Sequence, residues 1–267
     1  MAESAGEEVT GDERLSESEW ASVRLRSYLD ELTHAPMDED PPLSPRVPIA
    51  LAAKRILKHV VPESLRPTVT FAATDAIRPF ASRRAHRLAR TPRPVLVQLG
   101  SGYSPKLGWI NVDVVGKGAD VAWNLRRRLP FDDGTVDAVF HEHLLEHLTL
   151  ADGFALTTEI FRMLRLGGVI RAGVPDAERY IRSYAANGEE LDRLRPGRPT
   201  KLLAVQEVFL RHGHRAAYDF ETLRLVLSAV GFVDVRLCEF GETDLPQAPD
   251  SEHRREESIY VEARKPR

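Results

Sequence analysis

The chain has 267 residues, of which 42% are hydrophobic, and its formal net charge at pH 7 is −3. This length predicts one large domain with an appendage, and the small net charge excludes a general attraction to nucleic acid or to membranes. No apolar run reaches the roughly 18 residues of a membrane span, no N-terminal segment suits a signal peptide, and a single cysteine excludes an internal disulfide. We therefore expect a cytoplasmic protein.

The N-terminal third of the chain divides by charge. Residues 1–40 hold twelve Asp and Glu against three Arg, whereas residues 46–93 hold eleven Lys and Arg against two acids. We expect a disordered acidic tail over 1–15 and a helical extension over 16–93, through which two copies could form a homodimer. The basic helices either turn their arginines to solvent, or form a lid or docking surface for an anionic or glycan acceptor. A membrane-surface helix is disfavoured, because charged residues interrupt the apolar face.

The first predicted strand, Val95–Leu99, leads into a glycine turn. Its apolar run is continuous rather than alternating, which is typical of a buried parallel strand. Gly100 and Gly102 follow at once, and glycine lets the backbone adopt positive φ and approach a ligand closely. A second strand, Trp109–Val112, ends at Asp113, where a carboxylate could receive hydrogen bonds from a ribose diol. The alternative interpretation is that these two glycines close a β-turn and bind no ligand.

The spacing of these residues carries a family resemblance. The segments Leu99-Gly-Ser-Gly102, Gly108-Trp-Ile-Asn-Val-Asp113 and Leu129-Pro-Phe131 resemble the bacterial branch of the class I S-adenosylmethionine-dependent methyltransferases. A nicotinamide site would need a third glycine where Pro105 stands, and its acid would come later than Asp113. The resemblance covers about residues 94–264. It implies a methyltransferase domain over 94–267 with a Rossmann-like, doubly wound α/β sheet, mostly parallel with a closing antiparallel hairpin, and S-adenosyl-L-methionine as cofactor.

The resemblance also implies which residues bind the cofactor. Asn124 stands where the family has an acid that accepts from the adenine amino group, and its amide oxygen could accept in the same way or satisfy the local turn. The backbone amide of Leu125 would donate to the adenine ring. Gln98 replaces an acid that meets the cofactor's amino group in many of these enzymes. The predicted cofactor-binding residues are Gly100, Ser101, Gly102, Asp113, Asn124, Leu125 and His141.

A dense chemical cluster follows the predicted strand 135–140. Its sequence is His141-Glu-His143-Leu-Leu-Glu146-His147, and the end of a parallel strand places it near the cofactor's methionine end and the acceptor. His143 is the first candidate for a general base, because imidazole titrates near neutral pH.

The same cluster has two other interpretations. His143-x-x-Glu146-His147 matches a zinc motif, because imidazoles at i and i+4 share a helix face, and this would indicate a metal-dependent hydrolase. The preceding strand and the family resemblance argue against it, so we expect no tightly bound metal. Gln98, Asn124 and Leu166 also differ from the residues that the family usually has at these positions. A catalytically silent cofactor-binding or scaffold protein is therefore a further alternative.

The last third of the chain completes the predicted domain. After a helix over 152–164 and a strand over 169–174, Asp176 either contacts the acceptor or caps the helix 177–184. Polar material near 177–213 is predicted to form a wall of the acceptor pocket. His214 and Asp176 are the second and third candidate bases. Helix 220–230 and strands 233–240 and 257–264 close the fold.

The function indicated is methylation of a polar acceptor, foremost a hydroxyl group of a sugar, a glycan or a small metabolite. Nucleic acid is not the expected acceptor, although the fold accommodates such acceptors as well.

Overall fold

The computed structural model describes residues 16, 18–20, 22, 23, 26, 65–90, 94–102, 104–114, 119–186, 188–196, 200–210 and 213–267. The acidic tail expected over 1–15 and residues 27–64 of the expected helical extension lie outside these residues. Residues 18–20 are helical, and the Ser18 hydroxyl donates a 2.9 Å hydrogen bond to the carbonyl oxygen of Ser228. No described helix is long and apolar enough to cross a membrane.

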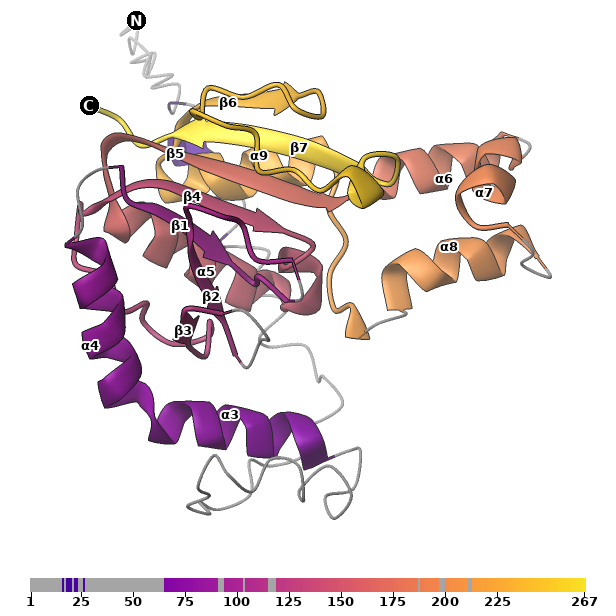
Figure 1. Ribbon diagram of the computed structural model, residues 1–267. Helices are drawn as coiled ribbons and strands as arrows, with labels where there is room; N and C mark the ends of the chain where they lie inside the picture. The colour runs from indigo at the N-terminus through magenta and orange to yellow at the C-terminus, as the bar shows by residue number, and fades with distance from the viewer. Residues whose placement is uncertain are drawn as a thin grey trace, which may run out of the picture.

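A seven-stranded sheet forms the centre of the molecule, in the order β3-β2-β1-β4-β5-β7-β6 (Figure 1). Neighbouring strands from β3 to β5 pair in parallel, and β7 is antiparallel to both β5 and β6. The predicted sheet, mostly parallel and closed by an antiparallel pair, is therefore confirmed. The strands are β1 (Leu96–Leu99), β2 (Ile110–Asp113), β3 (Val121–Ala122), β4 (Val136–Glu142), β5 (Leu164–Pro175), β6 (Val233–Cys238) and β7 (Ser258–Arg264).

The register of the central strands sets the place of the site. Leu99, the last residue of β1, pairs with Val112 of β2 on one side and with His141 of β4 on the other. Because the three strands are parallel, the chain leaves all of them at the same edge. The glycine loop, Asp113 and the histidine cluster therefore begin side by side, at the edge where open α/β sheets bind ligands.

Helices α5 and α9 pack against each other and against one face of the sheet. Each begins at a side-chain cap: Thr149 accepts from the Asp152 amide at 3.1 Å, and Asp219 accepts from the Thr222 amide at 2.7 Å. On the other face, a smaller apolar cluster includes Phe140 of β4 and is joined by residues such as Leu245 from the connection between β6 and β7. The helices are α3 (Arg66–Ala76), α4 (Arg78–Ala89), α5 (Leu150–Met163), α6 (Ala177–Ala185), α7 (Glu189–Leu194), α8 (Lys201–Leu210) and α9 (Phe220–Val230).

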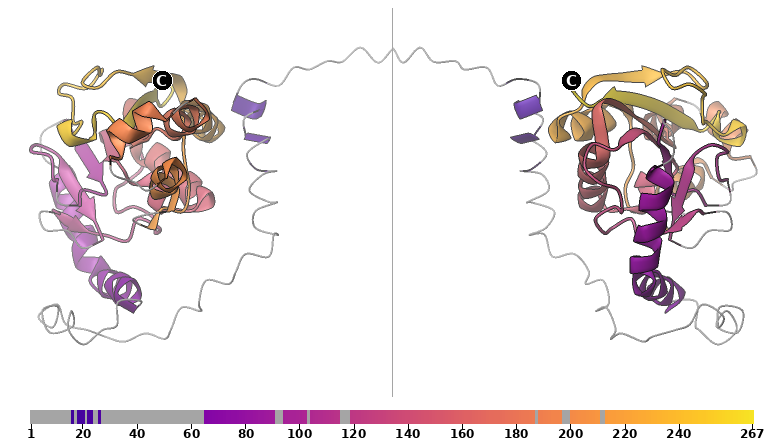
Figure 2. Two further views of the ribbon diagram at one scale, coloured as in Figure 1. Left: turned by 90° about the vertical axis from the view of Figure 1, so that its right-hand side faces the viewer. Right: turned by 60° about the vertical axis from the view of Figure 1, so that its left-hand side comes forward.

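The described part of the basic extension forms α3 and α4, which meet at Ile77; Figure 2 shows them from two sides. Helix α4 buries Ala81 and Ala85, while Arg83 and Arg87 are exposed. Its small residues allow close packing and its arginines remain in water, as expected for the solvated face.

Helices α6, α7 and α8 form a lobe beyond the end of β5 (Figure 1). The segment is too polar for a strand, and it folds into helices around its own cluster, which includes Tyr180, Leu191 and Val205. This lobe corresponds to the insertion predicted near 177–213.

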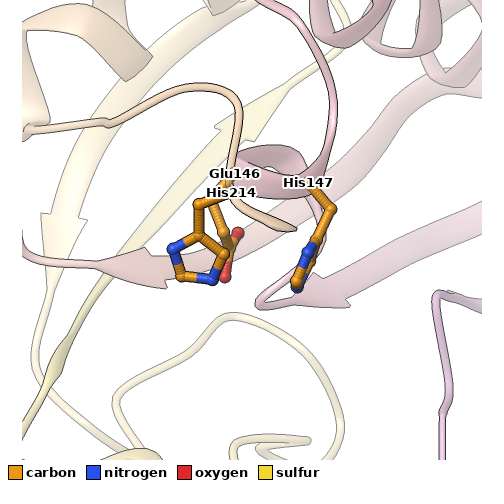
Figure 3. A group of neighbouring side chains, drawn as sticks. All are labelled: Glu146, His147 and His214. Atoms are coloured by element: carbon orange, nitrogen blue, oxygen red, sulfur yellow. The ribbon is translucent and has the colours of Figure 1, made fainter. Parts of the chain in front are cut away.

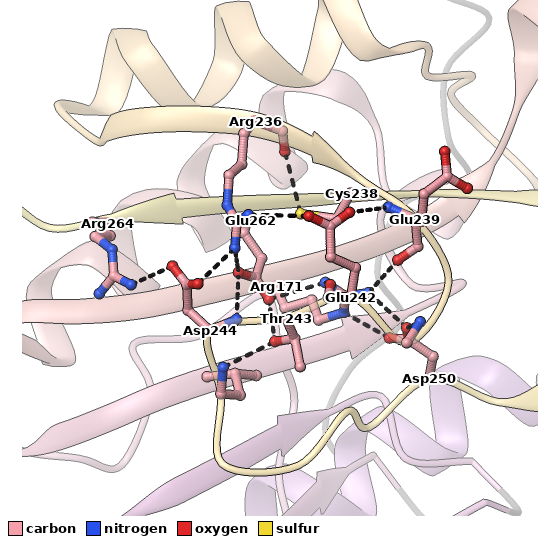
Figure 4. A network of polar contacts seen from close by, with 12 residues as sticks. Arg171, Arg236, Cys238, Glu239, Glu242, Thr243, Asp244, Asp250, Glu262 and Arg264 are labelled. Atoms are coloured by element: carbon pink, nitrogen blue, oxygen red, sulfur yellow. Dashed lines mark hydrogen bonds and ion pairs between the residues drawn. The ribbon is translucent and has the colours of Figure 1, made fainter.

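A buried ion network ties the closing strands together (Figure 4). Arg171 of β5 is fully buried and lies 2.6 Å from a carboxylate oxygen of Asp250 and 2.9 Å from one of Glu262 on β7. Arg236 of β6 reaches the other oxygen of Glu262 at 2.8 Å. Burial disfavours the charge of Arg171, but the two carboxylates outweigh it and raise the guanidinium pKa.

Candidate functional site

The glycine loop after β1 is held by the end of β2. Gly100 and Gly102 both have positive φ, at 67° and 51°. The Gly100 amide donates to the Val112 carbonyl oxygen at 2.8 Å, and the Gly102 amide donates to a carboxylate oxygen of Asp113 at 2.7 Å. Asp113 therefore fixes the loop as well as lying where a ribose was predicted.

Leu144 packs directly on this loop. A Cβ atom on Gly100 would stand 2.9 Å from the Leu144 side chain, whereas a Cβ atom on Gly102 would meet no described atom within 4 Å. The absence of a side chain at Gly100 thus lets the segment after β4 approach the loop. At Gly102 it leaves the backbone open to a ligand.

Two predicted cofactor contacts are buried polar groups. Ser101 is 3% exposed and His141 is fully buried, and neither the hydroxyl oxygen nor the imidazole nitrogens have a hydrogen-bond partner within the described part of the chain. Burial lowers the pKa of His141 to about 4, so this imidazole is neutral at physiological pH. Unpartnered buried polar atoms beside an open glycine loop fit a bound nucleotide cofactor.

The side chain of Asn124, which was predicted to contact the adenine, makes a local hydrogen bond. Its side-chain oxygen accepts from the Arg126 amide at 3.1 Å, which is the turn-forming alternative left open by the sequence. Leu125 is buried in the main core. The second departure, Gln98, accepts from the Lys106 amide at 2.9 Å and therefore orders the connection to β2.

His143 occupies a constrained position after β4. Its φ is 51°, a left-handed value that few residues other than glycine adopt, and its amide donates to the Gly173 carbonyl oxygen. Nε2 shares a 2.7 Å hydrogen bond with the Ser258 hydroxyl on β7, and Nδ1 lies 3.3 Å from a carboxyl oxygen of Glu146. Ser258 carries no signal in the sequence, because its strand lies more than a hundred residues away.

Burial controls the protonation of this pair. Burial, followed by the nearby charge of Arg254, lowers the pKa of His143 to about 3. Burial raises the pKa of Glu146 to about 8. Both side chains are therefore neutral near pH 7, since the interior disfavours the imidazolium and the carboxylate alike.

The zinc motif predicted as an alternative is not built as a helix. Residues 145–147 form a single 3-10 turn, and the left-handed backbone of His143 precedes it. The shared face of an α-helix, on which that motif depends, is therefore absent here, and the hydrolase interpretation loses its basis. Instead, Glu146 and His147 lie next to His214, and their ligand atoms and that of His214 are within 4.8 Å of one another (Figure 3).

Asp176 caps α6. Its carboxylate accepts from the Arg179 amide at 3.0 Å, and its backbone forms a bridge with Tyr218. Of the two roles that the sequence left open, the structure gives direct evidence for the cap. Tyr218, which is almost fully buried, has no described hydrogen-bond partner for its hydroxyl.

Part of the chain that carries this site is similar to a known protein family. Residues 116–172, which include β3, β4 and most of β5, match the methyltransferase domain family. No curated protein matches the sequence.

Solved structures with a similar chain course include S-adenosylmethionine-dependent methyltransferases. One from Archaeoglobus fulgidus is 17% identical over 72% of this chain and 94% of its own, with a TM-score of 0.43. One from Thermotoga maritima is 15% identical over 79% of this chain and 99% of its own, with a TM-score of 0.43. Phosphoethanolamine N-methyltransferase 2 from Haemonchus contortus is 13% identical over 71% of this chain and 53% of its own, with a TM-score of 0.39. These values carry no argument about the acceptor.

The family match covers the strand and the turn that carry the histidine cluster. The glycine loop held by Asp113 lies beside them, at the carboxyl edge of the sheet. The part of the chain that matches the methyltransferase domain family, residues 116–172, therefore carries the histidine cluster of the candidate site.

Proposed function

We propose that this chain is an S-adenosylmethionine-dependent methyltransferase that acts on a hydroxyl group of a sugar, a glycan or a small metabolite, with His143 as the general base. One observation carries the proposal: Leu144 packs on the loop glycine Gly100. The backbone of the neighbouring residue, His143, is therefore held near the loop that the cofactor would occupy, while its imidazole meets Ser258 on β7. An acceptor oxygen bound between the imidazole and the cofactor would be close to the transferred methyl group.

The cofactor would be held by the residues predicted from the sequence. The amides of the glycine loop and the carboxylate of Asp113 would bind the ribose side, Asn124 and Leu125 the adenine, and His141 with Ser101 the buried end. The cofactor supplies a methyl group activated on a sulfonium. The chain's residues exclude water, align the acceptor oxygen with that methyl group and remove its proton.

Among the three candidate bases, His143 is placed first by its position next to Leu144, which packs on the glycine loop. A neutral imidazole has a lone pair with which to accept a proton, and burial keeps His143 neutral. Asp176 already accepts the Arg179 amide as a helix cap, and Nδ1 of His214 faces the Val208 carbonyl oxygen at 2.6 Å. His214 and Asp176 remain the second and third candidates.

The lobe of α6, α7 and α8 is proposed to form the wall of the acceptor pocket. It begins directly after Asp176 and ends shortly before His214, so both of its ends adjoin the candidate site. Its exposed apolar side chains, among them Tyr184 and Leu202, offer surfaces on which a sugar ring could stack or pack.

The test is a methyl-transfer assay with labelled S-adenosylmethionine and a panel of hydroxyl and amine acceptors. Once an acceptor is found, His143→Ala should lower turnover roughly 10²–10⁴-fold with nearly unchanged cofactor affinity. His86→Ala on α4 is the matched control, and Asp176→Asn, which retains a capping side chain, should also keep turnover near normal.

Two outcomes would contradict the proposal. Transfer only to amines would remove the hydroxyl acceptor. Normal turnover of a folded His143→Ala protein at saturating cofactor would pass the role of base to His214 or Asp176.

A further inference from the structure

Two histidines and a glutamate from distant parts of the chain meet beside the candidate site. Glu146 and His147 lie on the 3-10 turn after β4, and His214 lies on the segment between α8 and α9. Figure 3 shows the carboxyl group and the two rings extending in the same direction from their backbones. The rings of His147 and His214 are nearly perpendicular, with centroids 4.8 Å apart.

The backbone fixes this meeting of the two segments. The amides of Arg215 and Ala216 both donate to the carbonyl oxygen of Glu146, at 2.6 and 3.2 Å. His214 is therefore held next to the turn that carries Glu146 and His147. Such anchoring limits how far the three side chains can separate.

The hydrogen bonding of His214 assigns its tautomer. Nδ1 lies 2.6 Å from the Val208 carbonyl oxygen, and because a carbonyl only accepts, Nδ1 carries the proton. The lone pair is consequently on Nε2. Histidine ligands of metals almost always donate their second ring N–H to a carbonyl or carboxylate in this way, because that bond fixes the ring and its tautomer.

Glu146 supplies the independent sign of a ligand. Its side chain is 2% exposed, and neither carboxyl oxygen has a hydrogen-bond partner among the residues that the structure describes. Buried carboxyl groups in native proteins are nearly always paired, hydrogen-bonded or bound to metal.

We propose that Glu146, His147 and His214 form a binding site for one divalent transition metal ion, with Zn²⁺ as the first candidate. Two imidazoles and one carboxylate form a ligand set that zinc accepts while keeping an open coordination position. Zinc bonds of about 2.0–2.2 Å require ligand atoms roughly 3.3 Å apart, and the present separations, which are all within 4.8 Å, would shorten on binding.

This site differs from the zinc motif visible in the sequence. That motif uses His143 and His147, whereas here His143 lies behind Glu146, with Nδ1 3.3 Å from its carboxyl oxygen. His143 would orient the carboxylate ligand rather than bind the ion itself. The sequence predicts no tightly bound metal at His143-x-x-Glu146-His147, whereas the fold adds His214 to Glu146 and His147.

The test is a titration of the untagged, full-length, chelator-treated protein with Co²⁺, followed by visible absorption, and then displacement by Zn²⁺. We expect one ion per chain, with His147→Ala, His214→Ala and Glu146→Gln each weakening Co²⁺ binding at least 10-fold. His86→Ala, the same change on α4, should bind as the unmodified chain does. Circular dichroism establishes which variants are folded, and the folded ones decide the result.

Stoichiometric binding that weakens in the folded cluster variants alone supports the site. No stoichiometric binding overturns it, as does unchanged affinity in the cluster variants or an equal loss in His86→Ala. The titration contains neither cofactor nor acceptor, so the metal site and the proposed methyl acceptor stand or fail separately.

Discussion

Asp113 joins two parts of the candidate cofactor site. One carboxylate oxygen accepts the Gly102 amide at 2.7 Å, and the carboxylate is also the group proposed to receive the ribose hydroxyls. Asp113→Ala removes both interactions, so we expect S-adenosylmethionine binding to weaken by about 1–3 kcal/mol, through the loss of charge-assisted hydrogen bonds. Isothermal titration calorimetry measures this change.

The matched control for Asp113 is Asp132→Ala, because Asp132 is an exposed acid in the turn before β4. It should leave the cofactor dissociation constant unchanged. Wild-type affinity in a folded Asp113→Ala protein would show that the ribose lies elsewhere.

His141 makes folding stability sensitive to acid. Burial lowers its pKa to about 4, whereas an imidazole in the unfolded chain titrates near its ordinary pKa of 6.5. At pH values between about 4 and 6.5, His141 binds a proton in the unfolded state but not in the folded state. Stability contributed by the neutral imidazole is therefore complete above pH 6.5 and decreases as the pH falls toward 4.

The size of this effect follows from the separation of the two pKa values. His141→Gln removes this titrating group. Between pH 6.5 and 4, the free energy of unfolding of the variant should therefore fall less than that of the unmodified chain, and the difference should be on the order of 3 kcal/mol. Urea unfolding at a series of pH values measures the difference. Parallel pH dependences for the two proteins would mean that His141 gains a partner or solvent in the native state.

The closing strands depend on the buried charge of Arg171. Its replacement by Met would leave the carboxylates of Asp250 and Glu262 buried beside an uncharged side chain, because both lie within 3 Å of the guanidinium. We expect Arg171→Met to lower the free energy of unfolding by about 3–5 kcal/mol in urea denaturation.

Arg128 provides the control for this substitution, since it pairs with Asp133 at 3.3 Å on the surface. Arg128→Met should change stability by less than about 1 kcal/mol. A loss in Arg171→Met as small as that in the control would mean that the two carboxylates find other partners or become protonated without cost.

The strands and helices that could be predicted from the sequence have local signals. The mostly apolar run before Gly100 forms β1. Asp219 before an amphipathic run marks the start of α9, which ends at Val230 with Gly231 as its cap. The segment 143–147 could not be predicted in this way. Its spacing fits a helix face, but the left-handed turn at His143 follows from contacts with β5 and β7, which local patterns do not encode.

At the scale of the whole molecule, the sequence predicts where ligands bind better than which side chains they meet. Parallel strands that end in glycine, Asp113 and histidine place the candidate site at one edge of the sheet. The partners within that site come from far away in the chain: Ser258 for His143, and His214 for Glu146. Only the fold brings these residues together.

The helical lobe and the covering of the second sheet face could not be predicted from local sequence patterns. The polar segment predicted as an insertion forms α7 and α8 around a separate apolar cluster, and Leu245 covers part of the second sheet face from a long connection. Both features depend on tertiary contacts between segments of low periodicity. In the basic extension, the arginines Arg83 and Arg87 of α4 are exposed, and its role as a lid or docking surface stays a prediction.

Binding of S-adenosylmethionine at the carboxyl edge of β1, β2 and β4 is the property on which the other site assignments depend. Calorimetry of the full-length protein with S-adenosylmethionine, S-adenosylhomocysteine and NAD tests it most directly. We expect one molecule of either sulfur-containing ligand per chain, weaker binding in Asp113→Ala, and no binding of NAD. A folded protein that binds neither S-adenosylmethionine nor S-adenosylhomocysteine, or that binds NAD instead, would contradict the account.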